Sequence, residues 1–376
     1  MAKDVFNTAL ADSQATHVTP ISPERFDRAR YADYAAQLDE RCAHFWQADE
    51  GVLVYRRMRV KEVFAEDCRD WERSLAWQLG ALDASMAYKA DVANFLEPWY
   101  GLGTVAAAYG FDYRWEAGQA PAVDGKFATT AELVAAPFRP VAETPIGRHT
   151  LDMVSYFLDK TRGELPISFC DVQSPLNTLS NIIDSNSFYL DLMLDPESIE
   201  VAMDRTADLL IDFTEEQRKL IGSALAKPGH GFASSRRFDG LGMSDDTVTM
   251  LSPDLYFPLC VPAMTKVGDR FGGAVFHSCG CWSDKKEEIA RIAGLRMADG
   301  AFSLATDPGA NPTEGFAEAF AGTGVVLNAR IVGDADLVCE KVRSLWRPGM
   351  KLIVVTYCET PAEQAALYDR IHEICQ

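Results

Sequence analysis

The second half of this 376-residue chain alternates short β-branched or aromatic runs with signals that begin helices. The runs that the pattern predicts as strands are residues 232–240, 274–277, 301–305, 325–331 and 352–357. Capping side chains followed by proline begin helices at Asp195-Pro196, Ser252-Pro253, Asn311-Pro312 and Thr360-Pro361. Because connections that contain a helix join parallel strands, the alternation predicts an α/β fold with a parallel sheet.

The parallel sheet is expected to close into a barrel. Open doubly wound sheets that bind dinucleotides carry a Gly-x-Gly-x-x-Gly string after a strand, and no such string follows a predicted strand here. A (β/α)8 barrel also fits the length, since such barrels reach about 400 residues as one unit. Earlier barrel strands are expected at 91–99 and 167–172, and the second strand is placed only roughly, between residues 113 and 136.

The first 85 residues follow a different pattern. Stretches 25–46 and 63–89 have the character of helices rich in charge and tryptophan, and the clear strand run among them is 52–55. We therefore expect residues 1–85 to form an N-terminal helical extension. Residues 86–376 are expected to form the barrel, with the extension packed on it as one structural unit.

Composition and charge exclude several classes of partner. The net charge of −19 and the pI near 4.7 repel phosphate backbones and anionic lipid, so neither nucleic acid nor a membrane surface is expected as a partner. The N-terminus lacks a basic stretch followed by an apolar run, and no apolar run reaches the roughly 20 residues of a membrane span. A cytoplasmic location is expected. Nine scattered cysteines then favour free thiols over a disulfide framework.

The strongest candidate for a functional site is the string His277-Ser278-Cys279-Gly280, which ends a predicted strand. In an extended strand residues two apart project to the same side, so His277 and Cys279 can grip one ion. Imidazole and thiolate suit zinc, and a third ligand is expected from Cys358, because all strand ends of a barrel converge on one rim. Cys281 is an alternative to Cys279. The alternative to a metal site is an ordinary interior pair.

Polar and aromatic side chains near the predicted strand ends complete the candidate site. Asp246 and Glu97 are the catalytic candidates: Asp246 as a general acid or an orienting group, and Glu97 as a carboxylate that occupies the open metal position. The substrate-binding candidates are Trp99, Tyr100, Trp282, Asp307, Asn328 and Tyr357. Their aromatic members form a wall suited to a flat ring. Alternatively, the aromatic residues fill the core and the carboxylates cap loops.

Three features together resemble one known family. They are the strand-terminal His277-x-Cys279-Gly280, the string Met243-Ser244-Asp245-Asp246 followed by Leu251-Ser252-Pro253, and the late Cys358. From about Leu165 onward the chain is similar to the uroporphyrinogen decarboxylase superfamily, specifically its zinc-dependent, corrinoid-linked methyltransferase branch. A weaker likeness extends back to residues 97–103. The resemblance implies a (β/α)8 barrel in which His277, Cys279 and Cys358 bind a catalytic zinc ion.

The resemblance also bears on the choice between methyl transfer and decarboxylation. Decarboxylases of this superfamily carry an N-terminal Arg-Gln-Ala-Gly-Arg-Tyr element that cradles substrate carboxylates. The nearest string here, Arg28-Ala29-Arg30-Tyr31, does not match its spacing. The resemblance therefore favours a methyltransferase. Because no cobalamin-binding module is visible in the chain, the cobalt is expected on a separate corrinoid (cobalamin) protein.

An open fourth position on the zinc would serve either half of corrinoid methyl transfer. The predicted aromatic wall favours a small O-methyl substrate such as a methoxylated aromatic compound, which makes the chain an O-demethylase component. Three alternatives stay open: a methylcobamide:thiol methyltransferase, a decarboxylase-like enzyme without metal, and a non-catalytic corrinoid-associated binding protein.

Overall fold

A computed structural model describes residues 16–64, 66–98, 103–115, 121–229 and 231–376. Its main sheet has six parallel strands in the order β1-β8-β7-β6-β5-β4. These strands are β1 (Gly51–Arg56), β4 (Leu241–Ser244), β5 (Ala274–His277), β6 (Leu295–Ala301), β7 (Val326–Arg330) and β8 (Lys351–Thr356). The short strands β2 (Asp112–Arg114) and β3 (Ala122–Asp124) form a separate antiparallel pair.

Short segments between β1 and β4 close the main sheet into a barrel. The first segment is bonded to β1 through the N–H of Asp91 and the carbonyl oxygen of Val54, 2.8 Å apart. Parallel bridges then join Leu96 to Ile167, Ile167 to Leu225, and Gln173 to Ser244 of β4. The α/β barrel is therefore confirmed. The strands predicted at 91–99 and 167–172 are present as bridged segments rather than long strands.

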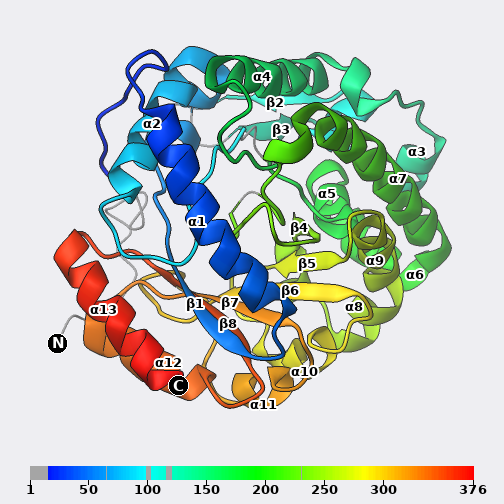
Figure 1. Ribbon diagram of the computed structural model, residues 1–376. Coiled ribbons are helices and arrows are strands. Elements are labelled where there is room, and N and C mark those ends of the chain that lie inside the picture. Colours follow the sequence, from blue (N-terminus) through cyan, green and yellow to red (C-terminus); the bar gives the residue numbers. More distant parts are fainter. Residues whose placement is uncertain (1–15, 65, 99–102, 116–120, 230) are drawn as a thin grey trace.

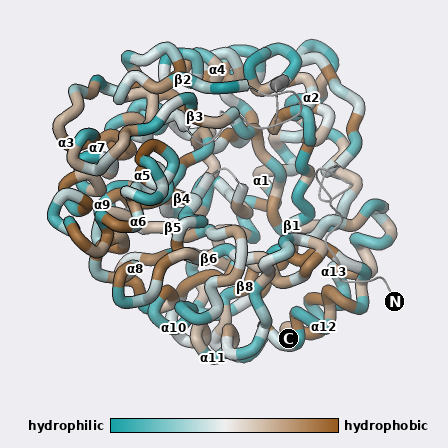
Figure 2. The backbone as a smooth tube through the Cα atoms, turned by 180° about the vertical axis from the view of Figure 1, so that it is seen from behind, coloured by the Kyte–Doolittle hydropathy of each residue, from teal (hydrophilic) through white to brown (hydrophobic). Residues whose placement is uncertain are grey.

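Helices surround the barrel in Figure 1. Those before β4 are α1 (Arg28–Gln47), α2 (Trp71–Ser85), α3 (Thr130–Ala135), α4 (Pro145–Thr161), α5 (Pro175–Ile182), α6 (Ser185–Leu194) and α7 (Pro196–Ile221). Those after β4 are α8 (Pro253–Leu259), α9 (Val261–Arg270), α10 (Lys286–Ile289), α11 (Phe316–Phe320), α12 (Ala335–Leu345) and α13 (Pro361–Ile374). The helices carry both hydrophobic and hydrophilic stretches in Figure 2, as expected when one face packs on the sheet. No helix in the described ranges is long and apolar enough to cross a membrane.

Helix α1 closes the end of the barrel where the strands begin. It crosses the sheet in Figure 1, and its Cys42 and Phe45 pack with Leu53 of β1 and other interior side chains of the strands. The Lys351 ammonium group, at the first residue of β8, donates to the carbonyl oxygen of Trp46 at 2.8 Å. Helix α1 does not cover the opposite rim, where the strands end, and a functional site is expected there.

The predicted boundary near residue 85 does not coincide with the beginning of the sheet. Strand β1, which that boundary assigns to the helical extension, pairs with β8 along its whole length, from Gly51 with Lys351 to Arg56 with Thr356. The predicted extension therefore contributes a barrel strand as well as helices. The second barrel strand was also misplaced, because residues 113–136 contain the β2–β3 pair and α3 instead.

Two predicted strands are displaced, for physical reasons. Residues 232–240 form turns, and β4 begins only at Leu241. Phe232 and Phe238 are buried inside the barrel, which explains the apolar pattern. Between them, Arg236 interrupts the pattern and pairs with Asp39 of α1 at 2.6 Å. The run predicted at 301–305 likewise begins where β6 ends.

One predicted helix start is wrong. No helix begins at Asn311-Pro312, and α11 starts at Phe316 after Gly315, which has a φ of +79°. The side chain of Asn311 accepts the backbone N–H of Trp282 at 2.8 Å instead of capping a helix. The start at Thr360 is confirmed, including its capping box with Glu363.

Candidate metal centre

The candidate site lies where β5 ends, at the open rim of the barrel. In the register of the sheet, His277 of β5 is paired with Ser244 of β4 on one side and with Asp299 of β6 on the other. After His277 the chain leaves the sheet, and Gly280 turns it with a φ of +76°, a conformation that glycine adopts far more readily than other residues. The turn presents Cys279, whose side chain is exposed, at the rim.

A buried carboxylate fixes the imidazole ring of His277. Oδ2 of Asp299 lies 2.5 Å from Nδ1 of His277 and also accepts a hydrogen bond from Nε of Arg330 at 2.9 Å. Its other oxygen accepts a hydrogen bond from the amide of Asn328 at 2.5 Å. Because Nδ1 is occupied in this way, Nε2 is the nitrogen that points to a possible metal ion, as in carboxylate–histidine–metal arrangements.

Nε2 of His277 faces a thiol and a second carboxylate. Sγ of Cys279 lies 3.5 Å from this nitrogen, and Oδ1 of Asp246 lies 3.8 Å from it. Potential ligand atoms of the three residues all lie within 4.8 Å of one another. Among the described residues, no other three His, Cys, Asp or Glu side chains form such a group. Nitrogen, sulfur and oxygen donors are the set that proteins use for zinc, so the residues present fit this metal.

Neighbouring charges shift the pKa values of His277 and Asp299 in opposite directions. Burial opposes a charge on the ring of His277, but Asp299 and Cys279 outweigh burial and raise its pKa to about 10. Burial would likewise raise the pKa of Asp299, yet Arg330 and His277 lower it to about 2. Asp299 is therefore an anion at neutral pH. A metal ion that binds Nε2 has to displace a proton, which links metal binding to proton release.

Cys358 follows β8 at the same rim but lies outside the group of close ligand atoms. Its carbonyl oxygen accepts a hydrogen bond from Nε of Arg56 at 2.8 Å, and burial raises the pKa of its thiol to about 11. Cys281, the alternative to Cys279, is exposed and lies 3.1 Å from the hydroxyl of Ser283. The structure thus brings His277 and Cys279 together, while the ligand role of Cys358 stays a prediction.

Two buried arginines stand beside the cluster. Arg57, directly after β1, lies 3.8 Å through Nη2 from Oε1 of Glu97. Oε1 of Glu97 also accepts the N–H of Gly231 at 3.1 Å, so this carboxylate pairs with Arg57 instead of joining the metal-ligating group. In the described part of the chain, Nη2 of Arg330 and the hydroxyl of Tyr357 are buried without a hydrogen-bond partner. Nη2 of Arg330 and the hydroxyl of Tyr357 are therefore available as hydrogen-bond donors to an anion.

The remaining predicted site residues divide between the loops and the core. Asp307 accepts the N–H groups of Gly280 at 3.3 Å and Gly309 at 2.7 Å, so it stabilises the rim loops. Trp282 is completely buried, and its ring centroid lies 5.3 Å from that of Phe276. Its predicted place in an exposed aromatic wall is therefore wrong.

Two further members of the predicted aromatic wall, Trp99 and Tyr100, lie outside the described residues. Asn328 is fully buried and serves Asp299 rather than an open pocket. Within the described residues, Tyr357 is the member of the proposed wall whose side chain is partly exposed at the rim.

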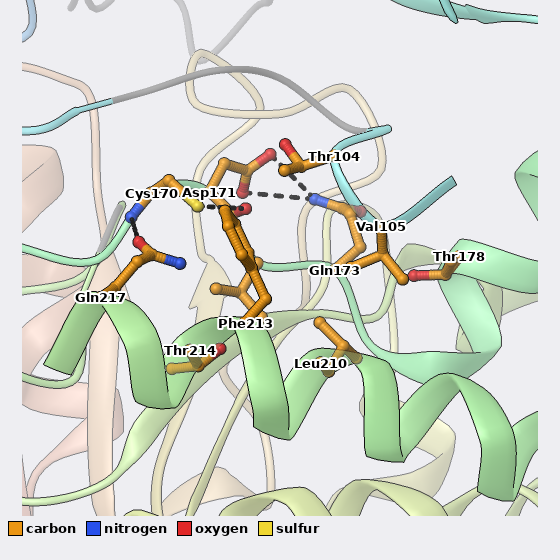
Figure 3. Close-up of a pocket in the computed structure, with 11 residues that line it drawn as sticks. Thr104, Val105, Cys170, Asp171, Gln173, Thr178, Leu210, Phe213, Thr214 and Gln217 are labelled. Carbon is orange, nitrogen blue, oxygen red and sulfur yellow. Dashed lines mark hydrogen bonds between the residues drawn. The ribbon is translucent and has the colours of Figure 1, made fainter. Parts of the chain in front are cut away.

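A small cavity lies apart from this cluster, between the segment near Asp171 and helix α7 (Figure 3). Its volume of about 10 Å³ is close to the space that one water molecule needs. Figure 3 shows the side chain of Gln217 on α7 accepting the backbone N–H of Cys170, and the amide of Gln173 bonded to Asp171. The cavity is too small for an organic substrate.

Sequence reasoning missed Asp299, Arg330 and Arg57 as parts of the site. Asp299 and Arg330 lie in the interior of the sheet, where a charge interrupts the apolar pattern and carries no motif of its own. A usable signal existed for Arg57, because the consecutive Arg56 and Arg57 directly follow the predicted strand run 52–55. Asp246 was expected as a catalytic group, and its proximity to the His277–Cys279 pair shows a second possible role.

The fold and this cluster define a class of protein: an α/β barrel with a His–Cys–carboxylate group at the strand ends. A sequence model of the family described as Uroporphyrinogen decarboxylase (URO-D) matches residues 42–227. Over this matched part, just under half of the chain, the sequence is similar to that family. A solved methyltransferase from Methanosarcina mazei is similar, with a TM-score of 0.64 and 15% identity over 89% of this chain and 98% of that chain. No curated protein sequence matches the chain.

The family model compares sequence, and the solved structure compares the fold. The family match includes β1 and ends after α7, whereas the motifs that carried the resemblance lie mostly after Leu165. It also begins at residue 42, before the predicted boundary at 85. At 15% identity, the likeness to the methyltransferase shows a shared fold.

Proposed function

We propose that the chain is a zinc-dependent methyltransferase that moves a methyl group between a small substrate and the cobalt of a partner corrinoid protein. The observation that supports this most is the convergence of His277, Cys279 and Asp246 at the rim, with Asp299 behind the imidazole ring. The shared fold with a methyltransferase from Methanosarcina mazei adds support.

The residues of the chain have separable tasks in this proposal. His277 and Cys279 would hold zinc, and the sequence predicts Cys358 as the third ligand. When bound, zinc supplies Lewis-acid chemistry that stabilises a leaving phenolate or alkoxide, or an attacking thiolate. Asp299 keeps Nε2 of His277 turned to the site, through the 2.5 Å contact at Nδ1. A corrinoid partner would approach the exposed side chain of Cys279 at the strand ends.

The favoured reaction is demethylation of a small O-methyl compound, such as a methoxylated aromatic. Fewer aromatic side chains are available to bind such a ring than the sequence suggested, because Trp282 is in the core. Nη2 of Arg330 and the hydroxyl of Tyr357, which are buried without a hydrogen-bond partner, instead favour a substrate that also carries an anionic group. In the alternative reaction the methyl group moves in the opposite direction: the methyl–cobalt bond breaks, a zinc-bound thiolate would accept the methyl group, and reduced cobalt leaves.

A metal-free, decarboxylase-like enzyme is the second candidate. It requires a basic pocket, and the buried Arg57 and Arg330 are the observation that favours it. A polycarboxylate substrate would use these guanidinium groups directly. The His277–Cys279 pair has no task in such a reaction, which is why we place it second.

Metal analysis combined with a methyl-transfer assay tests the proposal. We expect protein purified without chelators to contain zinc, and to transfer methyl groups when supplied with a corrinoid protein and a panel of methoxylated compounds and thiols. Cys279→Ser should lower zinc content and methyl transfer together. Decarboxylation of a porphyrinogen by zinc-free protein would favour the second candidate. Bound zinc with no methyl transfer to any compound would indicate a binding protein.

A further inference from the structure

We propose that Asp246, rather than Cys358, is the third protein ligand of the metal site, so that the site has one sulfur ligand and not two. This inference rests on the proposed binding of zinc by His277 and Cys279 and changes the ligand set. It departs from the expectation that the family resemblance supplies.

The distances favour Asp246. Its Oδ1 lies 3.8 Å from Nε2 of His277, and its carboxylate belongs to the one described group in which all ligand atoms lie within 4.8 Å. Oδ1 also accepts the backbone N–H of Cys279 at 2.6 Å, which fixes the carboxylate beside the thiol. Because the Asp246 side chain is 40% exposed, it faces the open rim and not the core.

The residues on both sides of Asp246 are anchored at the start of α5, by its N-cap Ser174 and by Asn177. The preceding residue, Asp245, accepts a hydrogen bond from the hydroxyl of Ser174 at 2.5 Å. The following residue, Thr247, donates its backbone N–H to Oδ1 of Asn177 at 2.9 Å and its hydroxyl to the same oxygen at 2.6 Å. The anchoring residues Ser174, Asn177 and Thr247 are all buried. A ligand held on a fixed backbone needs little reorganisation to bind an ion.

Cys358 has a different environment. Its thiol is only partly buried and packs beside the apolar core. The carbonyl oxygen of the same residue is held by Nε of Arg56 at 2.8 Å. The residue after it, Glu359, is held through its carbonyl oxygen by the hydroxyl of Tyr88 at 2.7 Å. Bringing Sγ of Cys358 to His277 and Cys279 therefore requires a movement that Asp246 does not need.

The two ligand sets differ in a way that spectroscopy detects. X-ray absorption at the zinc edge of the wild-type protein should show one sulfur and otherwise nitrogen and oxygen neighbours, because zinc–sulfur bonds of about 2.3 Å are longer than bonds to nitrogen or oxygen. Two sulfur neighbours would overturn the inference. This measurement needs no variant, so it does not depend on how any substitution affects folding.

Zinc affinity, measured by competition with a chromophoric chelator, gives the second test. Asp246→Asn should weaken zinc binding by more than the roughly 10- to 100-fold that loss of an outer-shell partner costs. Its amide oxygen can still accept the N–H of Cys279, so the loop is retained. Cys358→Ser should change the affinity by less than the roughly 10-fold that loss of even an outer-shell partner costs.

Asp184→Asn is the matched control. Asp184 also accepts backbone N–H groups, at 3.1 and 3.2 Å, but at the start of α6. It should leave zinc affinity unchanged. Loss of zinc binding in Cys358→Ser but not in Asp246→Asn overturns the inference and leaves the proposed function standing. Absence of zinc binding by the wild-type protein overturns both.

Discussion

Asp299 is a charged residue in the middle of a barrel strand, a position that apolar side chains usually occupy. It is fully buried and holds three partners, His277, Asn328 and Arg330. A buried charge of this kind is tolerated only when its partners satisfy it. Asp299 therefore connects the orientation of the His277 imidazole, a proposed metal ligand, to the stability of the sheet.

Replacing Asp299 should affect both properties. In Asp299→Asn the ring of His277 loses its anionic partner, and zinc affinity should fall about 10- to 100-fold. Arg330 would be left as a buried cation without a carboxylate, which should lower the free energy of unfolding by about 3 kcal/mol. Chelator competition measures the first effect and urea denaturation of the metal-free protein measures the second.

Asp336→Asn is a suitable control for this variant. Asp336 pairs with Arg370 at 2.8 Å, and the two side chains are 89% and 39% exposed. Exposed pairs contribute at most about 1 kcal/mol, so this variant should behave as the wild type in both measurements. Equal zinc affinity in Asp299→Asn and the wild type would remove Asp299 from the metal site.

Single residues of the site differ in how readily the sequence predicts them. His277 and Cys279 are found because their spacing along a strand fixes a common side. Asp299 is hidden, because a carboxylate between Ala298 and Gly300 has no local signature, and its partners come from the two neighbouring strands, β5 and β7. The proximity of Asp246 depends on how η6 (Asp246–Met250) is anchored to α5, which no spacing rule encodes.

At the scale of elements, the buried Asp91 joins three of them. It accepts hydrogen bonds from the N–H of Val54 on β1 at 2.9 Å, from Arg41 on α1 at 3.2 Å, and from the hydroxyl of Tyr368 on α13 at 2.6 Å. Nε2 of His372, also on α13, lies 2.9 Å away. One carboxylate thus ties the helix that closes the barrel and the C-terminal helix to the first strand.

Asp91→Asn should destabilise the protein. It replaces a charged acceptor in a buried network, and the free energy of unfolding at neutral pH should fall by about 3 kcal/mol. Urea denaturation, followed by circular dichroism, measures the change. The exposed neighbour Asp369, whose side chain is 58% exposed, provides the control Asp369→Asn, which should change stability by less than about 1 kcal/mol.

The effect of Asp91 should depend on pH. Burial alone would raise its pKa, but hydrogen bonds from His372, Tyr368 and the N–H of Val54 lower it below the ordinary value of 3.8. A carboxyl whose pKa is lower in the folded state stabilises the protein above that ordinary value. The stability is lost as the pH falls below 3.8 toward the pKa of the folded state. The difference between wild type and Asp91→Asn should therefore shrink below this pH; a constant difference would contradict the assignment.

Elements with an uninterrupted β pattern were predicted well, and those with a charge inside were not. The predicted run 274–277 coincides with β5, and the runs 325–331 and 352–357 overlap β7 and β8. Strand β6 was placed too late, because Arg296 and Asp299 interrupt its first part and the apolar run at 301–305 follows it. Local pattern cannot reveal that a charge is satisfied across the sheet.

At the scale of the whole molecule, β1 makes the N-terminal region part of the barrel. A fragment of residues 86–376, the predicted barrel, lacks the strand that pairs with β8 along its whole length. We expect this fragment to unfold without a cooperative transition and to bind a hydrophobic dye, because an unpaired edge and the barrel interior would be exposed. Calorimetry and dye fluorescence test this.

A longer fragment, residues 16–376, separates loss of the strand from the effect of shortening the chain. It retains α1 and β1 and should unfold cooperatively near the melting temperature of the full chain. A cooperative transition of the 86–376 fragment within a few degrees of the full chain would show that the predicted domain boundary is an independent folding boundary.

In the proposed site, the side chain of Arg330 both pairs with Asp299 and is available to a substrate, and this restricts how the protein can evolve. Its Nε is bonded to Asp299 behind the metal-ligating ring, while its Nη2 is buried without a partner in the described part of the site. A mutation that adapts this position to an uncharged substrate would also remove the guanidinium partner of the buried Asp299. New substrate preferences at this end of the barrel must therefore arise through paired substitutions at positions 299 and 330, or through residues such as Arg57 that do not contact Asp299.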